Sequence, residues 1–236
     1  MKLSENSSDI KPRKKGNPDR SAERKRGRPR ADTNASIDEA RLLSVAFSMF
    51  AAQGYEASTM RAMARELDVS HNLLNVRFGR KSDLWKAAVD WRLAEAARDV
   101  ERAFTESEEP EERLRDLVHR FCHWAIINSD IVAISYQEGQ QDSWRLDYLI
   151  QQFILPFQIR LQQLMAEVAL QRQLTPIGSG ALLALLVHGV GSYFALKPLQ
   201  EKLLPDQFAV EGLSTDREAD VMAEFLLMGL FAGKPE

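Results

Sequence analysis

The sequence predicts an all-α protein in which a three-helix domain with helix-turn-helix geometry precedes a larger helical body. From residue 36 onward, apolar residues recur at helical spacing between Pro, Gly or acidic breaks, and we find no convincing alternating strand pattern. The 236 residues are 44% hydrophobic and 28% charged, close to the globular average, so the chain can bury a sizeable core. Charge is also distributed unevenly along the chain.

The N-terminal end is basic and the remainder is acidic. Residues 1–35 hold eleven Lys/Arg against five Asp/Glu, whereas residues 86–236 hold 14 against 23. A basic end on an acidic body suggests a polyanionic partner at that end. Because residues 1–35 contain almost no large apolar side chain, we expect them to form a flexible arm. Cys122 is the only cysteine, which excludes an internal disulfide framework and fits the reducing cytoplasm.

The first helix is expected to begin at Ser36, because Ser36 and Glu39 have the spacing of a capping box. Gly54 is expected to end it. The apolar stripe of this helix consists of Leu43, Ala46, Phe47 and Phe50.

Two short helices should follow. Ser58 or Thr59 can cap the first of them, and Ser70 can cap the second, which ends near Gly79. The break between them is Asp68-Val69. Two helices of about nine residues joined by so short a turn must cross steeply, which is helix-turn-helix geometry. The inner residues of the pair are Met60, Met63, Ala64, Leu67, Leu74 and Phe78.

The outer face of the second short helix is chemically able to read a DNA major groove. Asn72 and Val76 point away from the apolar side, with Leu73 and Arg77 beside them and His71 at the leading turn. Asn can pair with adenine, Arg with guanine, and an apolar side chain can contact the thymine methyl group. The alternative is a solvated helix face without a partner.

Residues 36–84 resemble the DNA-binding domain of the TetR family of bacterial transcriptional regulators. The matching residues are Phe50, Gly54, Tyr55, Ser58, Thr59, Met60, Arg61, Met63, Ala64, Val69, Ser70, Leu74, Phe78 and Lys81. The resemblance implies that Arg61 reaches a base and that Thr59 and Lys81 hold phosphates. Asn75 stands where the family has a phosphate-binding tyrosine, and Arg77 can restore that contact. The predicted surface comprises Thr59, Arg61, Ser70, His71, Asn72, Leu73, Asn75, Val76, Arg77 and Lys81.

A short basic element precedes this domain. The run from Lys25 to Arg30 resembles the core of an AT-hook, which lies in the minor groove of A·T-rich DNA. A narrow groove concentrates negative potential on inserted arginines, here Arg26, Arg28 and Arg30. The alternative is a basic tail that touches phosphates without sequence preference.

The helices of the body are expected at 81–106, 110–128, 130–140, 142–173, 177–197 and 215–231. By resemblance, residues 85–236 form an all-helical ligand-binding and dimerisation domain. Residues 173–196 carry no formally charged side chain, but their uninterrupted apolar run spans only Ala181 to Val187, far short of the ~20 residues that a bilayer needs. No membrane span is therefore predicted. The resemblance places a dimer interface here and on the last helix, with intramolecular core as the alternative, at Ala184, Leu185, His188, Val221, Phe225 and Met228.

Aromatic residues in the middle of the body are candidates for a ligand pocket. Pro156 should kink its long helix and leave a gap. Ordinary core packing is the alternative for each aromatic residue. The candidates are Phe121, Trp124, Tyr136, Trp144, Tyr148, Phe153 and Phe157.

One cluster carries metal-ligand chemistry. His119, Cys122 and His123 lie at i, i+3 and i+4, but spacing supplies no further ligand, so a partly buried helix face is favoured and we predict no metal. No P-loop, nucleophile elbow or HExxH motif is present, and neither enzymatic activity nor a cofactor is expected.

These features favour a cytoplasmic homodimeric regulator. We expect a repressor that leaves a palindromic double-stranded DNA operator when a small apolar or amphipathic effector enters the body. The alternative from another class is a ligand-independent DNA-organising protein that prefers A·T-rich sequence.

Overall fold

The first helix begins two residues later than its predicted cap. The computed structural model describes residues 38–196, 199, 202 and 214–231. Helix α1 (Glu39–Ala57) has Asp38 as its N-cap, whose carboxylate accepts a hydrogen bond from the backbone nitrogen of Ala40 at 3.2 Å. The prediction of Ser36 as the cap was wrong, because a carboxylate nearer the helix supplies both the acceptor and a favourable negative charge. Ser36 itself lies outside the described residues.

Gly54 interrupts α1 as expected. Its φ of 79° lies in the left-handed region that side chains rarely adopt, so the regular helix breaks there and one further turn follows. The buried hydroxyl of Ser58 lies 2.8 Å from the carbonyl oxygen of Gly54 and 3.1 Å from that of Met49, and its one proton can be donated to either. It therefore secures the broken end of α1.

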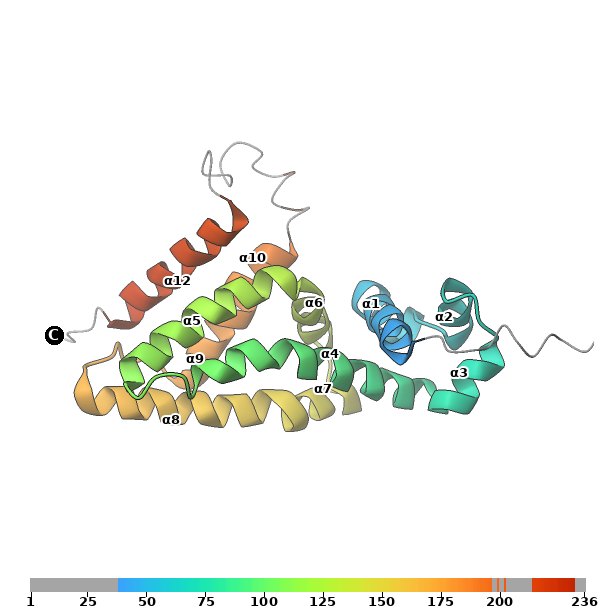
Figure 1. Ribbon diagram of the computed structural model, residues 1–236, viewed down its shortest axis with the longest axis horizontal. Coiled ribbons are helices and arrows are strands. Elements are labelled where there is room, and N and C mark those ends of the chain that lie inside the picture. The colour runs from blue at the N-terminus through green and yellow to red at the C-terminus, as the bar shows by residue number, and fades with distance from the viewer. Residues whose placement is uncertain (1–37, 197–198, 200–201, 203–213, 232–236) are drawn as a thin grey trace, which may run out of the picture. The chain divides into compact units, whose positions relative to one another are not determined.

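The head of the protein consists of α1, α2 (Met60–Glu66), α3 (His71–Phe78) and the first half of α4 (Lys81–Ala103). Figure 1 shows α4 running from the head into the body. Helix α1 packs on α4, and the predicted apolar stripe of α1 is buried. The largest side chains fully buried in the head are Leu42, Phe47, Phe50, Met63, Leu74 and Trp85.

The body is built around α5 (Pro110–Ile127), which packs against α4 and α8 (Leu155–Gln171). Helix α12 (Thr215–Phe231) lies along α5 (Figure 1). The predicted all-α fold class is confirmed, since the described residues contain no strand, and the predicted helical ranges agree with the structure to within a few residues at each end. The remaining elements are α6 (Ser129–Glu138), α7 (Trp144–Leu149), η1 (Ile150–Ile154), α9 (Ser179–Ala184), η2 (Leu185–Gly191) and α10 (Ser192–Ala195).

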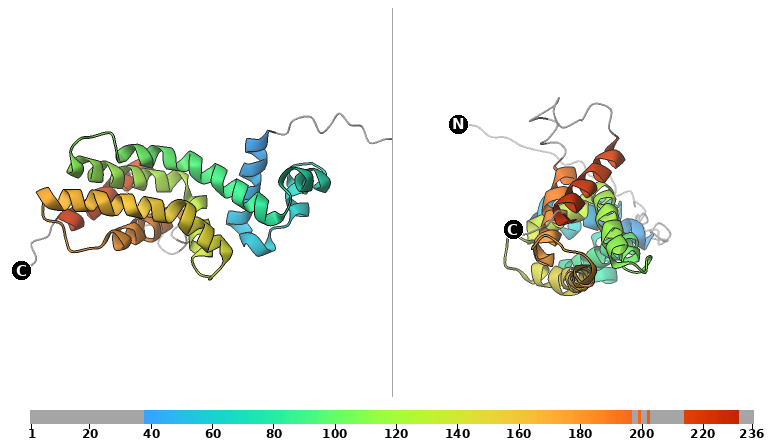
Figure 2. Two further views of the ribbon diagram at one scale, coloured as in Figure 1. Left: turned by 90° about the horizontal axis from the view of Figure 1, so that it is seen from below. Right: turned by 90° about the vertical axis from the view of Figure 1, so that its left-hand side faces the viewer.

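Two of the predicted long helices contain a π-helical segment. In η1, the backbone nitrogen of Leu155 bonds to the carbonyl of Ile150, one residue beyond the α-helical partner. Pro156 follows directly and has no N–H to donate. Figure 2 (left) shows the chain turning between α7 and α8, so the kink expected at Pro156 is present as a π segment before it.

The head and body share apolar core. Buried residues of α6 and α7, namely Ile131, Ile134 and Leu149, belong to the same cluster as the head residues. Helix α4 runs without interruption past residue 84, where the sequence placed a domain boundary. The described residues all fall within one compact unit, Ser36–Glu236.

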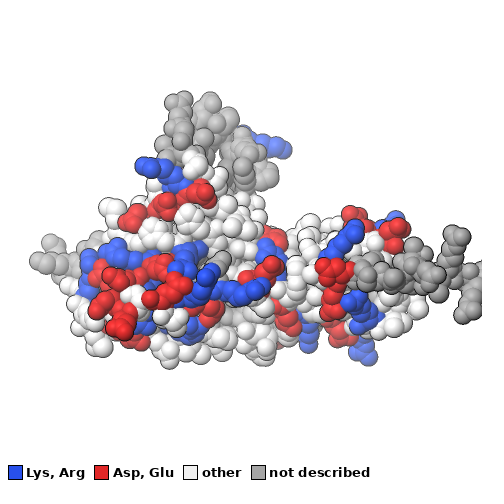
Figure 3. All heavy atoms as spheres, viewed as in Figure 1, with Lys and Arg blue, Asp and Glu red and all other residues white. Residues whose placement is uncertain are grey.

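Charged side chains of both signs intermix on the body. In the view of Figure 3, basic and acidic residues lie side by side over α5. Within that helix, Arg115 and Glu111 form an ion pair at 2.9 Å. Arg113 pairs with Glu167 at 2.6 Å. No helix within the described ranges is long and apolar enough to cross a membrane.

Candidate DNA-binding interface

Two hydroxyl caps and one left-handed residue shape the helix-turn-helix. The Thr59 hydroxyl oxygen accepts a hydrogen bond from Ala62 N at 3.1 Å, which identifies Thr59 rather than Ser58 as the cap of α2. Ser70 caps α3 in the same way through Leu73 N at 3.2 Å. Asp68 has a φ of 53°, a conformation that Asp tolerates better than most residues. The break and both caps therefore follow from the local sequence.

Helix α3 has one buried side and one solvent-facing side. Leu74 is fully buried, and Phe78 packs half-buried against the core of the head. Val76 on the opposite side is 77% exposed, so its apolar side chain can contact a partner. Among the other predicted base-contacting residues, Asn72 and His71 are exposed, while Leu73 is half-buried.

Side chains on this surface are held by neighbours before any DNA is bound. The Asn75 amide nitrogen lies 3.1 Å from His71 Nδ1, one helical turn away. The Arg77 guanidinium pairs with Glu39 at the start of α1, with 2.5 Å between NH2 and Oε2. The pair lies between α3 and α1, so the predicted phosphate-binding arginine carries an internal counter-charge.

The predicted phosphate-binding residues Thr59 and Lys81 flank α3, as does Arg61, which the resemblance implies reaches a base. Arg61 and Thr59 are exposed on and before α2. Lys81, the first residue of α4, is half-buried, and its Nζ donates to the carbonyl oxygen of Tyr55 at 2.9 Å. The same ammonium lies 4.0 Å from the Tyr55 ring centroid, a cation–π distance. The predicted minor-groove residues Arg26, Arg28 and Arg30 lie outside the described residues.

Aromatic side chains of α4, α7 and the end of α1 form a cluster beside the helix-turn-helix. The sequence analysis did not predict this cluster as part of the site. Trp85 of α4 meets the rings of Trp144 and Tyr148 of α7 edge-on, with centroids 5.3 and 5.9 Å apart. Tyr55 joins them, 5.6 Å from Trp144. Burial, together with the hydrogen bond to Asp90, raises the pKa of the Tyr148 hydroxyl to about 12. The aromatic content of α7 was a signal in the sequence, but nothing there paired it with the head.

Polar contacts from the body reach the end of α1 beside this cluster. The Gln137 side-chain amide of α6 donates to the carbonyl oxygen of Ala51 at 2.7 Å. Arg145 of α7 is buried and donates from Nε to Glu138 at 2.8 Å. Its NH1 lies 3.5 Å from the carboxylate of Glu56. Side chains of α6 and α7 therefore bond to the end of α1. Helix α4 also connects the head to the body through its own backbone.

The aromatic residues predicted to line a pocket fall into separate groups. Trp144, Tyr148 and Phe153 form part of the cluster around Trp85 or adjoin it. Phe121 pairs with Trp124, and Phe157 pairs with Phe104. Tyr136 is exposed. None of the seven lines the surface hollow on α12 or the one where α8 meets the following loop.

The residues predicted for the dimer interface share one property, which is exposure to solvent in this single chain. Phe225 is 76% exposed and Met228 is 71% exposed on α12. These two residues, with Val221, line the hollow on that helix. Leu185 of η2 is 45% exposed, and Ala184 and His188 beside it are exposed as well.

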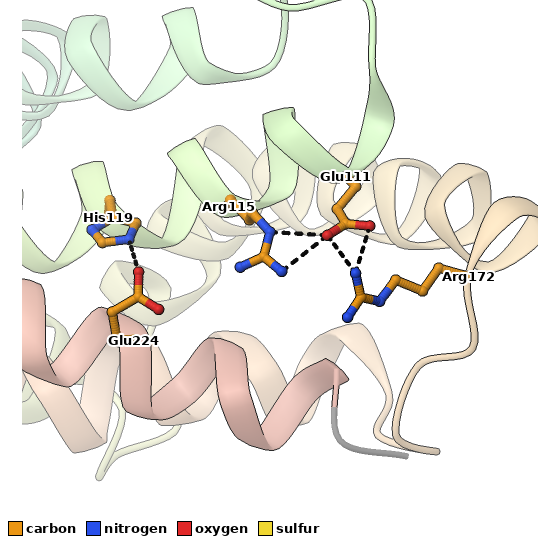
Figure 4. A network of polar contacts seen from close by, with 5 residues as sticks. All are labelled: Glu111, Arg115, His119, Arg172 and Glu224. Carbon is orange, nitrogen blue, oxygen red and sulfur yellow. Dashed lines mark hydrogen bonds and ion pairs between the residues drawn. The ribbon is translucent and has the colours of Figure 1, made fainter. Parts of the chain in front are cut away.

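Polar contacts from Asp220 and Glu224, at the edge of the same hollow, also join α12 to the body, and Figure 4 shows the contact of Glu224. His119 Nε2 lies 2.9 Å from Glu224, and His123 Nε2 lies 2.8 Å from Asp220. The hydrogen bond from His123 lowers the pKa of Asp220. Burial raises the pKa of the Cys122 thiol to about 12.

At the other end of α12, the side chains of Arg115 and Arg172 both bond to Glu111 (Figure 4). Their guanidinium groups also lie 4.5 and 4.6 Å from the ring centroid of Phe231. In the described part of the chain, no group of three or more His, Cys, Asp or Glu side chains is arranged to hold a metal ion. The side chains of His119 and His123 on α5 instead contact carboxylates of α12.

Comparison with known proteins identifies the head. A family model described as bacterial regulatory proteins of the tetR family matches residues 42–88. The resemblance to the TetR family is thus confirmed over the DNA-binding domain, and the helix-turn-helix is of that type. A sequence comparison with curated proteins finds no significant match.

Solved structures share the fold of most of this chain at low sequence identity. PfmR, a TetR family transcriptional regulator from Thermus thermophilus, is 17% identical, with a TM-score of 0.59 over 85% of this chain and 99% of that one. The ketosteroid transcriptional regulator KstR2 of Mycobacterium tuberculosis is 16% identical, with a TM-score of 0.60 over 83% and 96%. The regulator FadR from Bacillus subtilis, in complex with stearoyl-CoA, is 12% identical, with a TM-score of 0.60 over 81% and 99%. These neighbours are transcription regulators, and the likeness shows their fold in this chain.

Proposed function

We propose that this chain, which carries a tetR-type DNA-binding domain on the TetR-regulator fold, is a sequence-specific transcriptional repressor that binds a palindromic operator as a homodimer. The observation that carries the proposal is the face of α3. Asn72, Val76 and Arg77 stand exposed on a short helix whose opposite side is anchored by the buried Leu74. An anchored helix that presents an amide and an apolar group to solvent, with the Glu39-paired guanidinium of Arg77 beside them, can read base edges in a major groove.

The flanking groups supply phosphate contacts that set the register. The hydroxyls of Thr59 and Ser70 accept from backbone nitrogens as caps, so each retains an O–H that can be donated to a phosphate oxygen. Lys81 uses one ammonium N–H on the Tyr55 carbonyl and has two more. Arg61 on α2 and the Arg26–Arg30 segment complete the proposed surface, the latter in the minor groove beside the operator.

The exposed apolar side of α12 and η2 supports a second copy of the chain as partner. Val221, Phe225 and Met228 of α12 line one hollow and would remain in water in a monomer, as would Leu185 of η2, whereas exposed apolar patches on soluble proteins usually mark an interface. The polar contacts of His119 and His123 hold α12 to α5 and leave its apolar side outward. A two-fold dimer presents two α3 helices to half-sites one helical turn, ~34–36 Å, or a multiple of it apart.

Release by a small apolar or amphipathic effector completes the proposal. The structural neighbours include a ketosteroid transcriptional regulator and one in complex with stearoyl-CoA, and ketosteroids and stearoyl chains are largely apolar. An effector weakens operator binding only as far as it prefers the non-binding conformation, so a 100-fold release requires ~2.7 kcal/mol of differential affinity. Operator DNA must then weaken effector binding by the same factor.

Selection of bound duplexes from a random DNA pool tests the proposal. The regulator should enrich one palindrome, and removal of residues 1–30 should weaken binding most where that palindrome is flanked by A·T pairs. A pool that becomes A·T-rich without a shared palindrome would instead favour the DNA-organising protein. A thermal-shift screen of hydrophobic metabolites, followed by operator titration with each hit, tests the effector. Hits that stabilise the chain but leave operator affinity unchanged would remove the inducer from the proposal.

A further inference from the structure

Arg145 is a buried cation where the body meets the head. Its side chain is 9% exposed, and its ion-pair partner Glu138 is 6% exposed. The guanidinium carbon lies 4.5 Å from the ring centroid of Tyr55. A buried ion pair is costly to desolvate, so this pair is weak evidence for stability and points to a role in fixing a particular arrangement.

The ring that Arg145 contacts also contacts the phosphate-binding lysine of the proposed site. Lys81 Nζ lies 4.0 Å from the centroid of the Tyr55 ring and donates to the Tyr55 carbonyl oxygen. Tyr55 stacks on Phe50 with centroids 5.8 Å apart. It stands directly after the kink at Gly54, which separates it from the regular helix. One ring therefore connects a cation of α7 with the first residue of α4.

We propose that Arg145 is a positioning residue for DNA binding, which acts through Tyr55 to place the Lys81 ammonium beside α3. This inference rests on the proposed function. Lys81 lies three residues after the end of α3 and is the first residue of α4. The contacts that hold Tyr55 and the start of α4 therefore determine the position of the Lys81 ammonium. Movement of α7 in the body would change the phosphate contact without touching the base-reading face of α3.

The inference predicts a uniform effect on DNA binding. Removal of the Arg145 guanidinium should weaken binding to all duplexes alike, because a phosphate contact carries no sequence information. The ratio of operator affinity to random-duplex affinity should stay constant. The slope of log affinity against log salt should become shallower by ~0.9 for each phosphate that a chain no longer neutralises.

The test compares three variants of the full chain on the selected operator and on a scrambled duplex. The first is the charge-neutral pair Arg145→Gln with Glu138→Gln, which avoids leaving one buried charge alone. The second is Lys81→Gln, and the third combines all three substitutions. We expect the pair and Lys81→Gln each to make the salt slope shallower, and the combined variant to show no further change.

A matched control is available in α4 and α6. Arg92 of α4 pairs with Asp130 of α6 through nitrogen–oxygen distances of 3.0 and 3.1 Å, and their described contacts do not include Tyr55. Arg92→Gln with Asp130→Asn should leave the salt slope unchanged. Equal changes of the salt slope in the control and in the Arg145 pair variant would overturn the inference. Loss of any ion pair between the body and the head would then be enough to weaken the phosphate contact.

Additive effects of the Arg145 pair and Lys81→Gln would also overturn it, since the two groups would then act independently. An unchanged slope for Lys81→Gln would overturn it as well. Failure of the proposed function itself is distinguishable, because wild-type protein would then show no preference for any duplex.

If circular dichroism shows the pair variant to be unfolded, the single variant Arg145→Lys is measured instead. Lys keeps the positive charge beside Glu138 but lacks the planar guanidinium that lies over the ring of Tyr55. A shallower slope for Arg145→Lys supports the inference and an unchanged slope contradicts it.

Discussion

Arg77 on the outer part of α3 is paired with Glu39 at the start of α1, at 2.5 Å. The contact joins the first turn of the domain to the helix that we propose reads DNA. A phosphate that binds the Arg77 guanidinium must compete with the Glu39 carboxylate for its charge and its N–H groups. Glu39 therefore sets part of the cost of DNA binding at this position.

Glu39→Gln should tighten binding to every duplex by a factor of a few. The pair is partly exposed, with side-chain exposures of 33% and 59%, and exposed pairs contribute only ~0–1 kcal/mol. Titration of operator and scrambled duplex measures the change. Glu66→Gln is the matched control, since it removes an exposed negative charge of the head on α2. An identical gain in both variants would attribute the effect to net charge and not to Arg77.

Asn72→Ala should reduce discrimination among operator variants. Each bidentate contact to a base contributes ~1–3 kcal/mol of discrimination, so the preferred base at one position per half-site should lose most of its advantage. The fold should be unaffected because Asn72 is exposed. Affinities for the four bases at each operator position provide the readout. A uniform loss across all four would place Asn72 on the phosphate backbone instead.

The head could be predicted from sequence because its signals are local. Thr59, Ser70, Asp68 and Gly79 each act on backbone within four residues of themselves, and the structure places every one at a cap or a left-handed position. The cap of α1 was mispredicted because Ser36 and Asp38 offer similar chemistry two residues apart, and spacing alone does not choose between them.

The connection between head and body could not be predicted in this way. Tyr55 and Arg145 are far apart in the chain, and no periodicity relates them. The π segments η1 and η2 were likewise not predicted, since the apolar pattern continues through both. From sequence alone, the aromatic residues of α7 could equally line a ligand pocket or pack in the core. In the structure, Trp144 and Tyr148 pack against Trp85.

Phe225→Arg should produce a monomer that binds the operator poorly. In a dimer formed through α12, the substitution would bury an unpaired charge. Leu170→Arg is the matched control, because Leu170 is 88% exposed on α8 and lies outside the proposed interface. Sedimentation at micromolar concentration should give a dimer for wild type and the control. A monomeric wild type would contradict the proposed interface.

Asp220 should stabilise the fold in a pH-dependent way. Its pKa is lowered in the folded chain, first by the hydrogen bond from His123, so the folded state favours the carboxylate. This contribution is present above the unfolded pKa, about 4, and is lost as pH falls through the folded value. Because the side chain is 55% exposed, the effect should be at most about 1 kcal/mol.

Denaturant unfolding of wild type and Asp220→Asn should therefore differ above about pH 4 and converge as pH falls below that value. Asp216→Asn is the control, because Asp216 is 83% exposed and lies 3.9 Å from His123. It should show a smaller difference at every pH. A constant difference for Asp220→Asn between neutral and acidic pH would contradict the assignment.

The ratio of operator affinity to random-duplex affinity at physiological salt tests the central claim most directly. Two α3 helices of one dimer reading a palindrome should prefer the selected site by ~10³ or more. Affinity should also fall sharply when one half-site is scrambled, and the complex should contain two chains per duplex. A ratio near one, with equal binding to the intact and half-scrambled sites, would contradict the claim that this protein is a dimeric operator-reading regulator.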